Sequence, residues 1–405
     1  MGWRLFLPDN YFHRVENKVH EIAAALPETR VEGEGLMGGA AGLACFYAYY
    51  ADYSRKRSYK ERSMNMMERS INPPDGHRGR YSLSDGLAGI CWTIDHLIKN
   101  KLYDFDAADI FTNVDSLLYE GMMLEVREGH YDYLHGALGI ALFFLRDKEN
   151  EEYRNYLAEV VRELKNLAIT DADGSIKWNS VLDGDTGLQG VNLSLSHGMA
   201  SIIIILSKIM EAGIEESLCT DMIMGGLRYI EKRKLDPEEY LSSFPSWGVE
   251  NTEELKNSRL AWCYGDLGIA LAFITAGRQL KNTPYQMDGV DLLMRSSRRK
   301  DLIENSVHDA GICHGASGIA LIYNIMYQQT GRKSLCEAAL YWLDVSLNMA
   351  CHEDGLAGYK AWYHPEYGGW KANTGLLEGV GGIGLTLLSF ISEREANWAE
   401  SLLIN

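Results

Sequence analysis

The sequence predicts an all-α fold, an α/α toroid of about seven inner and seven outer helices with room for a small β-containing extension. The first observation behind this prediction is a repeated signature, a glycine followed three residues later by a second small residue and then by an apolar run. Its copies begin at Gly39, Gly86, Gly136, Gly198, Gly265, Gly315 and Gly379. Recurrence at such a period is typical of repeat architectures.

The second observation is the character of the segments after and between these signatures. The apolar runs are hydrophobic on nearly every side, as in helices that are buried all around. Small residues three apart share one helix face and let another backbone approach closely. Successive first glycines lie 47 to 67 residues apart, which leaves room for an amphipathic outer helix and its loops. An open helical solenoid is the alternative that this pattern leaves.

Taken in order, the chain begins with a polar helix over residues 10–26, and the first repeat follows over 35–50. A later helix covers about 150–168, residues 171–174 predict a turn, and residues 175–182 alternate like a strand. Residues 373–390 complete the ring, and a short helix ends the chain. We therefore expect one toroid domain over residues 1–405, with strand-containing insertions near 170–195 and 235–258.

Composition narrows the class of protein. The formal net charge of −17 disfavours nucleic acids and anionic membranes as partners. The sequence has neither a signal peptide nor an apolar stretch of 18 residues, so a cytoplasmic protein is expected. The seven cysteines should then be reduced, and those beside histidines favour metal binding over disulfides.

Parallel inner helices would bring the residues before each first glycine to one rim of the barrel. Most of these residues are ionisable or can bind metals, which a purely structural repeat does not require. They are Gly38, Asp85, His135, His197, Tyr264, His314 and Glu378.

Three residues of neighbouring repeats form a candidate zinc site. Cys263 and the pair Cys313 and His314 lie at equivalent positions, just before the inner helices of the fifth and sixth repeats. Two cysteines and a histidine leave a fourth zinc position for water or substrate, as in catalytic sites. A helix N-terminus also favours the thiolate. The alternative is buried cysteines with an incidental histidine.

Asp132 is a further candidate, four residues before Gly136 and among aromatic residues. A helix cap or a solvated loop acid is the alternative interpretation of this aspartate. No role is predicted for Asp85, His135, Glu378, Cys219, Cys336 or Cys351.

The motifs together resemble those of the lanthionine synthetase C-like family, most of all its bacterial lantibiotic cyclases, over essentially the whole chain. They are Arg259-x-x-Trp262-Cys263-Tyr264-Gly265, Ile312-Cys313-His314-Gly315, Ser196-His197-Gly198, Tyr131-Asp132 before Gly136, and Leu377-Glu378-Gly379. Two departures are minor, Ser201 in place of a second glycine and the additional imidazole of His135.

The resemblance implies an α/α toroid and a zinc-dependent cyclase. It makes Cys263, Cys313 and His314 the zinc ligands, His197 and Asp132 the acid and base, and Arg259 and Tyr264 accessory polar residues. The implied reaction adds peptide cysteine thiolates to dehydroalanine or dehydrobutyrine, which forms lanthionine or methyllanthionine thioether rings. The implied partners are a dehydrated precursor peptide with leader and core, a dehydratase, and an ABC transporter in a membrane-associated complex.

Three other functions are compatible with such a toroid. A protein prenyltransferase would use an aspartate, a cysteine and a histidine, so the second motif cysteine disfavours it. A glycosidase would pair carboxylates such as Asp85, Asp132 and Glu378, but would not need two cysteines and a histidine. The remaining alternative is a family member that binds glutathione or a signalling partner without cyclase activity.

Overall fold

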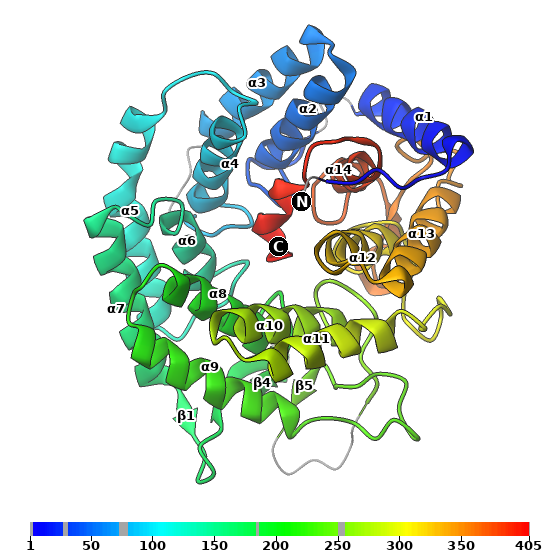
Figure 1. The fold of residues 1–405 in the computed structure, drawn as a ribbon. Coiled ribbons are helices and arrows are strands. Elements are labelled where there is room, and N and C mark those ends of the chain that lie inside the picture. Colours follow the sequence, from blue (N-terminus) through cyan, green and yellow to red (C-terminus); the bar gives the residue numbers. More distant parts are fainter. Residues whose placement is uncertain (1–2, 27–30, 73–79, 184–185, 250–255, 405) are drawn as a thin grey trace. The chain divides into compact units, whose positions relative to one another are not determined.

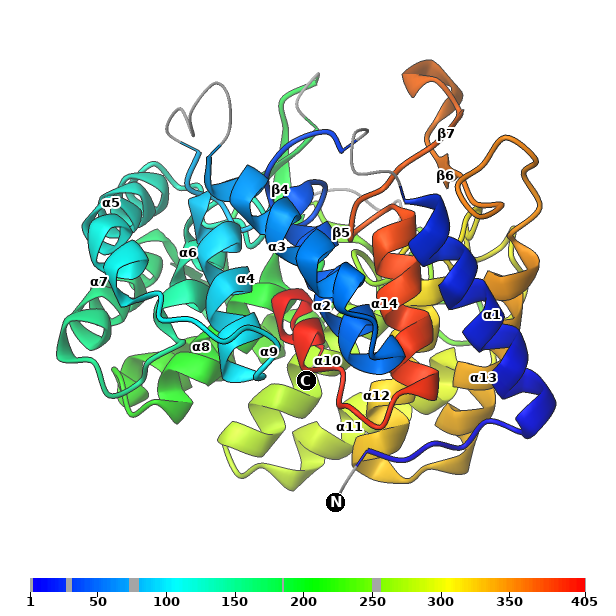
Figure 2. The ribbon, with the colours of Figure 1, turned by 90° about the horizontal axis from the view of Figure 1, so that it is seen from above.

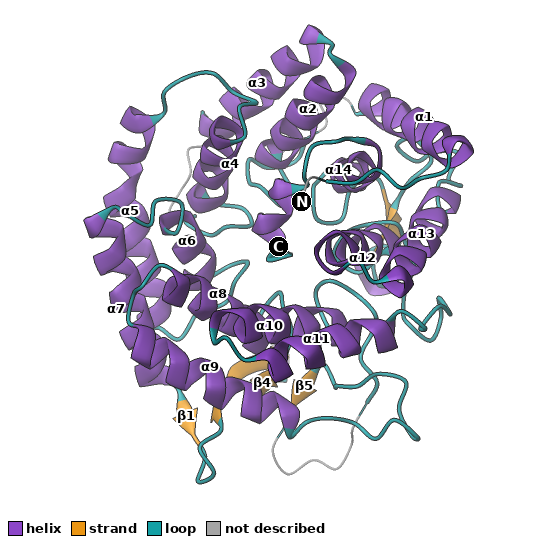
Figure 3. Ribbon diagram, in the orientation of Figure 1, coloured by secondary structure: helices purple, strands orange, loops and turns teal. Residues whose placement is uncertain are grey.

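The computed structural model describes residues 3–26, 31–72, 80–183, 186–249 and 256–404. The chain forms two compact units. Unit 1 consists of residues 1–114 and 307–405, and unit 2 of residues 115–306. Among the described residues, helices dominate and the strands are short (Figure 3).

Seven helices begin directly after the signature glycines, and their faces are buried on nearly every side. In α14 every residue is buried, as the continuous apolar run predicts. These core helices are α2 (Ala40–Ser54), α4 (Leu87–Lys99), α6 (Ala137–Phe144), α8 (Met199–Glu211), α10 (Asp266–Gln279), α12 (Ala316–Thr330) and α14 (Val380–Ile391).

The helices that alternate with them are amphipathic. In α7, for example, Tyr153, Leu157, Val160, Val161 and Leu164 form one buried stripe. The set comprises α1 (Asp9–Ala25), α3 (Arg57–Ile71), α5 (Ala108–Arg127), α7 (Glu151–Leu167), α9 (Glu216–Glu231), α11 (Thr283–Ser296) and α13 (Lys333–Asn348). The helices expected over 10–26 and about 150–168 are α1 and α7. The first repeat becomes helical only at Ala40, because residues 35–39 form its entry loop.

In unit 1, the core helices α4, α2, α14 and α12 pack against one another in that order (Figures 1 and 2). Their entry loops are joined by main-chain hydrogen bonds. The Met37 N–H donates to the Ser84 carbonyl (3.0 Å), and the Leu377 N–H donates to the Met37 carbonyl (2.9 Å). The N-terminal ends of these helices are thereby held at one edge of the unit. The short 3₁₀ helix η2 (Asn397–Leu402) ends the described chain.

In unit 2, α6, α8 and α10 pack in succession, and α7, α9 and α11 each cover the core helix that precedes them (Figure 1). Here too the entry loops are joined through the main chain. The N–H groups of Leu195 and Ser196 donate to the Cys263 carbonyl at 3.0 and 3.3 Å. The loops before α8 and α10 therefore run side by side.

In unit 1, the second glycine of the signature is required by the entry loop of its own helix. A Cβ on Gly318 would lie 1.9 Å from the Ile312 carbonyl oxygen, and one on Gly89 would lie 2.0 Å from that of Leu83. Each loop thus folds back over the first turn of the helix that follows. The sequence predicts that another backbone approaches the helix closely at its small residues. In these repeats that backbone is the entry loop directly before the helix.

Short strands lie in and near unit 2's loops. β1 (Ile169–Thr170) pairs with β2 (Ile176–Lys177), and β3 (Ser180–Asp183), β4 (Leu188–Asn192) and β5 (Trp247–Gly248) form an antiparallel sheet. The turn expected over 171–174 is confirmed by the bond from the Gly174 N–H to the Asp171 carbonyl. The strand expected over 175–182 is interrupted between β2 and β3, where the buried Trp178 donates its Nε1–H to the Leu164 carbonyl at 2.9 Å.

The segment near 235–258 contains β5, while residues 250–255 lie outside the described part of the chain. The expectation of one domain with two insertions stays a prediction. In unit 1, β6 (Ala361–Trp362) and β7 (Trp370–Lys371) form a hairpin around η1 (Pro365–Tyr367) that the sequence did not predict. No helix of the described chain combines the length and apolarity needed to cross a membrane.

Candidate active site

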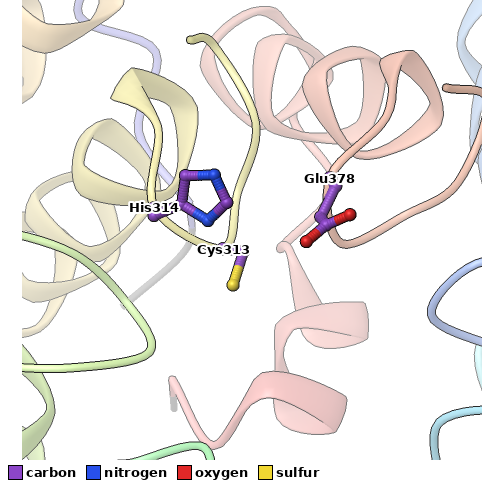
Figure 4. A group of neighbouring side chains, drawn as sticks. All are labelled: Cys313, His314 and Glu378. Atoms are coloured by element: carbon purple, nitrogen blue, oxygen red, sulfur yellow. The ribbon is translucent and has the colours of Figure 1, made fainter. Parts of the chain in front are cut away.

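The loop before α12 brings Cys313 and His314 next to the loop before α14. The N–H groups of Ile312 and Cys313 both donate to the Leu377 carbonyl at 2.9 Å, and Glu378 directly follows Leu377. The donor atoms of Cys313, His314 and Glu378 all lie within 4.8 Å of one another. Figure 4 shows the His314 ring and the Glu378 carboxylate turned toward each other from the two loops. Three potential metal ligands are therefore gathered within unit 1.

The ring of His314 is oriented by a buried carboxylate. Its Nε2 lies 3.6 Å from Asp309 Oδ2 and 3.4 Å from the Trp362 carbonyl oxygen. Asp309 is 2% exposed, and it accepts the N–H groups of Gly311 (2.9 Å) and Trp362 (2.8 Å). With Nε2 directed toward these oxygens, Nδ1 is the nitrogen available to a metal.

This arrangement fits a zinc ion. Thiolate, imidazole and carboxylate are the donor groups that zinc takes in proteins. A metal-binding histidine usually directs its other ring nitrogen at a carboxylate or a backbone carbonyl, and both surround Nε2 of His314. Unit 1 thus supplies Cys313 and His314 of the predicted ligand set, together with Glu378, for which the sequence predicted no role.

Glu378 is itself fixed by two polar neighbours from the β6–β7 region. The Tyr363 hydroxyl donates to Glu378 Oε2 at 2.6 Å, and Asn373 Nδ2 donates to the Tyr363 oxygen at 2.8 Å. Burial and the hydrogen bond to Glu378 raise the pKa of Tyr363, so this hydroxyl stays protonated and remains a donor. The carboxylate beside Cys313 therefore has a defined orientation.

In unit 2, the loop before α10 carries Arg259, Cys263 and Tyr264. Gly265 has a φ of +100°, and a Cβ there would lie 2.2 Å from the Arg259 carbonyl oxygen, so only glycine closes this loop without strain. Cys263 is 4% exposed, and its carbonyl holds the loop that leads to His197. Arg259 is exposed at the start of the loop.

His197 and Asp132 form a hydrogen-bonded pair. His197 Nδ1 lies 2.5 Å from Asp132 Oδ2, and Asp132 Oδ1 accepts the His135 N–H at 2.7 Å. Burial alone lowers the pKa of His197, but the hydrogen bond to Asp132 and the charges of Asp132 and Cys263 outweigh it and raise the pKa above its ordinary value. Asp132 thus both anchors its loop and orients the imidazole, while its role as a catalytic residue stays a prediction.

Tyr264 lies beside this pair. Its ring centroid is 6.3 Å from that of His197, and its hydroxyl accepts a hydrogen bond from Asn192 Nδ2 at 3.3 Å. Burial raises the pKa of the Tyr264 hydroxyl, which therefore remains protonated near neutral pH. The additional imidazole, His135, stacks against His197 with a centroid distance of 5.7 Å.

The sequence analysis missed a polar position that recurs six residues before the first glycine. Asn192, Asp309 and Asn373 hold this position before Gly198, Gly315 and Gly379. Each accepts the N–H two residues further on, at 3.0, 2.9 and 2.8 Å. Their second polar atoms contact Tyr264, Trp362 and Tyr363. A wider alignment of the repeats would have revealed these residues.

The predicted site residues therefore form two groups. Unit 2 brings Asp132, His197 and Tyr264 together, with Tyr264 on the loop that also carries Cys263, and unit 1 brings Cys313 and His314 together. Neither unit by itself contains all three predicted zinc ligands. The joint ligand set of Cys263, Cys313 and His314 stays a prediction.

Comparison with known proteins adds three findings. The family model described as "Lanthionine synthetase C-like protein" matches residues 30–403. "Nisin biosynthesis protein NisC" of Lactococcus lactis subsp. lactis is 25% identical over 348 residues, which cover 80% of this chain and 77% of that protein. The solved structure of nisin cyclase, 21% identical, matches with a TM-score of 0.77 over 98% of both chains. The predicted all-α toroid class and the predicted resemblance are confirmed.

Proposed function

This chain belongs to the lanthionine synthetase C-like family, and from that premise we propose that it is a zinc-dependent lantibiotic cyclase. The proposed reaction adds the thiol of a peptide cysteine across the double bond of dehydroalanine or dehydrobutyrine. The observation that carries the proposal is the environment of His314. Its Nε2 faces Asp309 and the Trp362 carbonyl, and the thiol of Cys313 lies beside it.

The proposed zinc ligands are Cys263, Cys313 and His314. When bound, zinc lowers the pKa of a coordinated thiol so that a peptide cysteine is a thiolate at neutral pH. This proposal requires that the loop before α10 supply its thiol to the same ion as the loop before α12. Glu378, fixed by Tyr363, is the further oxygen donor that unit 1 offers.

The proposed proton donor is His197. Addition of sulfur to the β-carbon leaves an enolate that needs one proton at its α-carbon, and an imidazolium at that point is a suitable general acid. The Asp132 carboxylate holds the ring through Nδ1, which leaves Nε2 to deliver the proton. Arg259 stabilises the negative charge that develops on the enolate oxygen, and the protonated Tyr264 hydroxyl adds a second donor.

The proposal extends to substrate, partners and location. The substrate would be a dehydrated precursor peptide with its leader, made by a dehydratase and exported by an ABC transporter. Cyclisation would take place in the cytoplasm, in a complex attached to the membrane through those partners. NisC, the relative from Lactococcus, is named for nisin biosynthesis, which supports a peptide substrate of this kind.

The test combines a metal analysis with a cyclisation assay. The purified protein should contain about one zinc ion per chain, in keeping with a three-ligand site. Incubation with a dehydrated precursor peptide should consume free peptide thiols without any change of mass, because the addition is an isomerisation. Zinc-loaded protein that binds thiols but leaves the peptide uncyclised would instead support a thiol-binding family member without cyclase activity.

A further inference from the structure

Unit 2 contains a cavity that none of the site residues lines. It lies between α9, α10, α11 and residues 243–244, with a volume of about 310 Å³. Its buried apolar lining consists of Phe244, Phe273 and Leu292. The cavity is therefore large enough for a short aliphatic group and offers an apolar surface to its stem.

Ser243 gives this cavity an unpaired polar atom. The residue is 1% exposed, and its Oγ has no hydrogen-bond partner among the described residues. Its backbone is nevertheless fixed, because its N–H donates to both carboxylate oxygens of Asp266 at 3.0 and 2.9 Å. A buried hydroxyl without a partner is unfavourable. A ligand atom that pairs with Oγ would remove that penalty.

Charged side chains complete the lining, and carboxylates are in excess. Asp288, Asp291 and Arg295 project from one face of α11, since they are three and four residues apart. Glu231 at the end of α9 and Lys234 beyond it line the same space. Within the part of the chain that the structure describes, none of these five side chains forms a hydrogen bond or ion pair.

The electrostatics favour a cationic ligand. Burial and the charge of Asp288 raise the pKa of Glu231 and outweigh the charges of Lys234 and Arg228, which lower it, so the two carboxylates repel each other. A positive group between them would relieve this repulsion, whereas an anion would face three carboxylates against two cations. The neighbouring rings of Phe244 and Phe273 are also compatible with a cation.

We propose that this cavity is a binding site for an alkylammonium group, carried either by a lysine side chain or by a free aliphatic amine. The alkyl stem packs against Phe244, Phe273 and Leu292. The ammonium donates its hydrogens to Ser243 Oγ and to the carboxylates around it. This site is separate from the predicted catalytic residues, and the inference does not rest on the proposed function.

The test is calorimetric titration of the full-length protein with n-pentylamine at neutral pH and low salt. Saturable binding is expected for the amine and none for 1-pentanol, which has the same chain without the charge. Nα-acetyl-lysine methylamide and its ε-acetylated form then distinguish the sources. If the protein binds n-pentylamine and Nα-acetyl-lysine methylamide but not the ε-acetylated form, the site takes lysine side chains. If it binds n-pentylamine and neither lysine derivative, the site takes free amines.

Two variants locate the binding. Ser243→Ala should weaken amine binding roughly tenfold, as expected for a lost hydrogen bond to a charged group. It should leave the thermal unfolding midpoint unchanged or raise it, because the buried hydroxyl has no partner to lose. Glu231→Gln should weaken binding by a similar factor. Asp221→Asn, which removes one exposed charge from the same helix away from the cavity, is the matched control.

The proposal is overturned if n-pentylamine and 1-pentanol bind equally. It is also overturned if Ser243→Ala binds the amine like the unaltered protein, or if Asp221→Asn weakens binding as much as Glu231→Gln does.

Discussion

His197 and His314 hold the same position in their repeats, directly before the first glycine, yet their surroundings differ. His314 faces a carboxylate of its own loop, with Nε2 3.6 Å from Asp309 Oδ2. His197 faces a carboxylate from the loop before α6, with Nδ1 2.5 Å from Asp132 Oδ2. The His314 side chain is 14% exposed, whereas the His197 side chain is 31% exposed.

The two histidines differ in which ring nitrogen remains free for chemistry and in the surroundings of that nitrogen. For His314 it is Nδ1, on an imidazole that lies within 4.8 Å of the donor atoms of Cys313 and Glu378, which suits a metal. For His197 it is Nε2 on a partly exposed ring, which suits proton transfer. One repeat position can therefore serve two kinds of chemistry, depending on where the neighbouring carboxylate is placed.

The largest effect is expected at the proposed metal ligands. Cys313→Ala removes one thiolate, so zinc should be almost entirely lost from the purified protein and ring formation with it. Metal content by atomic emission and circular dichroism would be measured together. The control is Cys351→Ala, an exposed cysteine outside the motifs, which should keep its zinc. A Cys313→Ala protein that retains zinc and forms rings would remove Cys313 from the site.

His197→Ala should separate proton transfer from metal binding. Zinc content should stay at the level of the unaltered protein, while ring formation slows about 10²- to 10⁴-fold, the usual contribution of a positioned general acid. The measurement is the single-turnover rate with a dehydrated peptide. Cyclisation at the original rate would show that another group donates the proton.

A smaller effect is expected at the carboxylate behind His314. Asp309→Asn should weaken zinc binding about 10- to 100-fold, as for other carboxylates that orient a ligating histidine. Competition with a chelator gives the affinity. The matched variant is Asp132→Asn, which removes the carboxylate behind His197 and should slow ring formation without changing zinc affinity. Equal zinc affinities for both variants would contradict the distinction between the two histidines.

The smallest effect concerns pH. Because Asp132 raises the pKa of His197 in the folded protein, Asp132→Asn should move the alkaline limb of the rate profile to lower pH. The same raised pKa stabilises the folded state fully below the unfolded pKa of about 6.5, and this contribution is lost as pH rises through the folded pKa. Urea midpoints at about pH 5.5 and about pH 8.5 should therefore differ more for the unaltered protein than for Asp132→Asn. If the difference between the two urea midpoints were the same for both proteins, the interaction of Asp132 with His197 would not contribute to folding stability.

The core helices could be predicted because one signature fixes where each of them begins, as Gly315 and Gly379 do for α12 and α14. The candidate residues next to those glycines could be predicted for the same reason. The contacts that orient these candidate residues could not be predicted, because the contacting groups belong to segments without a repeated sequence pattern. Asp309, for example, depends on the backbone of Trp362 in a two-residue strand. The interruption at Trp178 likewise depends on the hydrogen bond from its indole to the Leu164 carbonyl, which local alternation does not show.

The entry loops of unit 1 are joined through main-chain hydrogen bonds, from Met37 to Ser84, from Leu377 to Met37, and from Cys313 to Leu377. These hydrogen bonds use main-chain atoms, so they do not depend on which side chains the loops present. Evolution could therefore exchange reactive groups along this rim while the scaffold beneath stayed the same. A protein engineer could graft new functional groups at Gly38 or Asp85 by the same route.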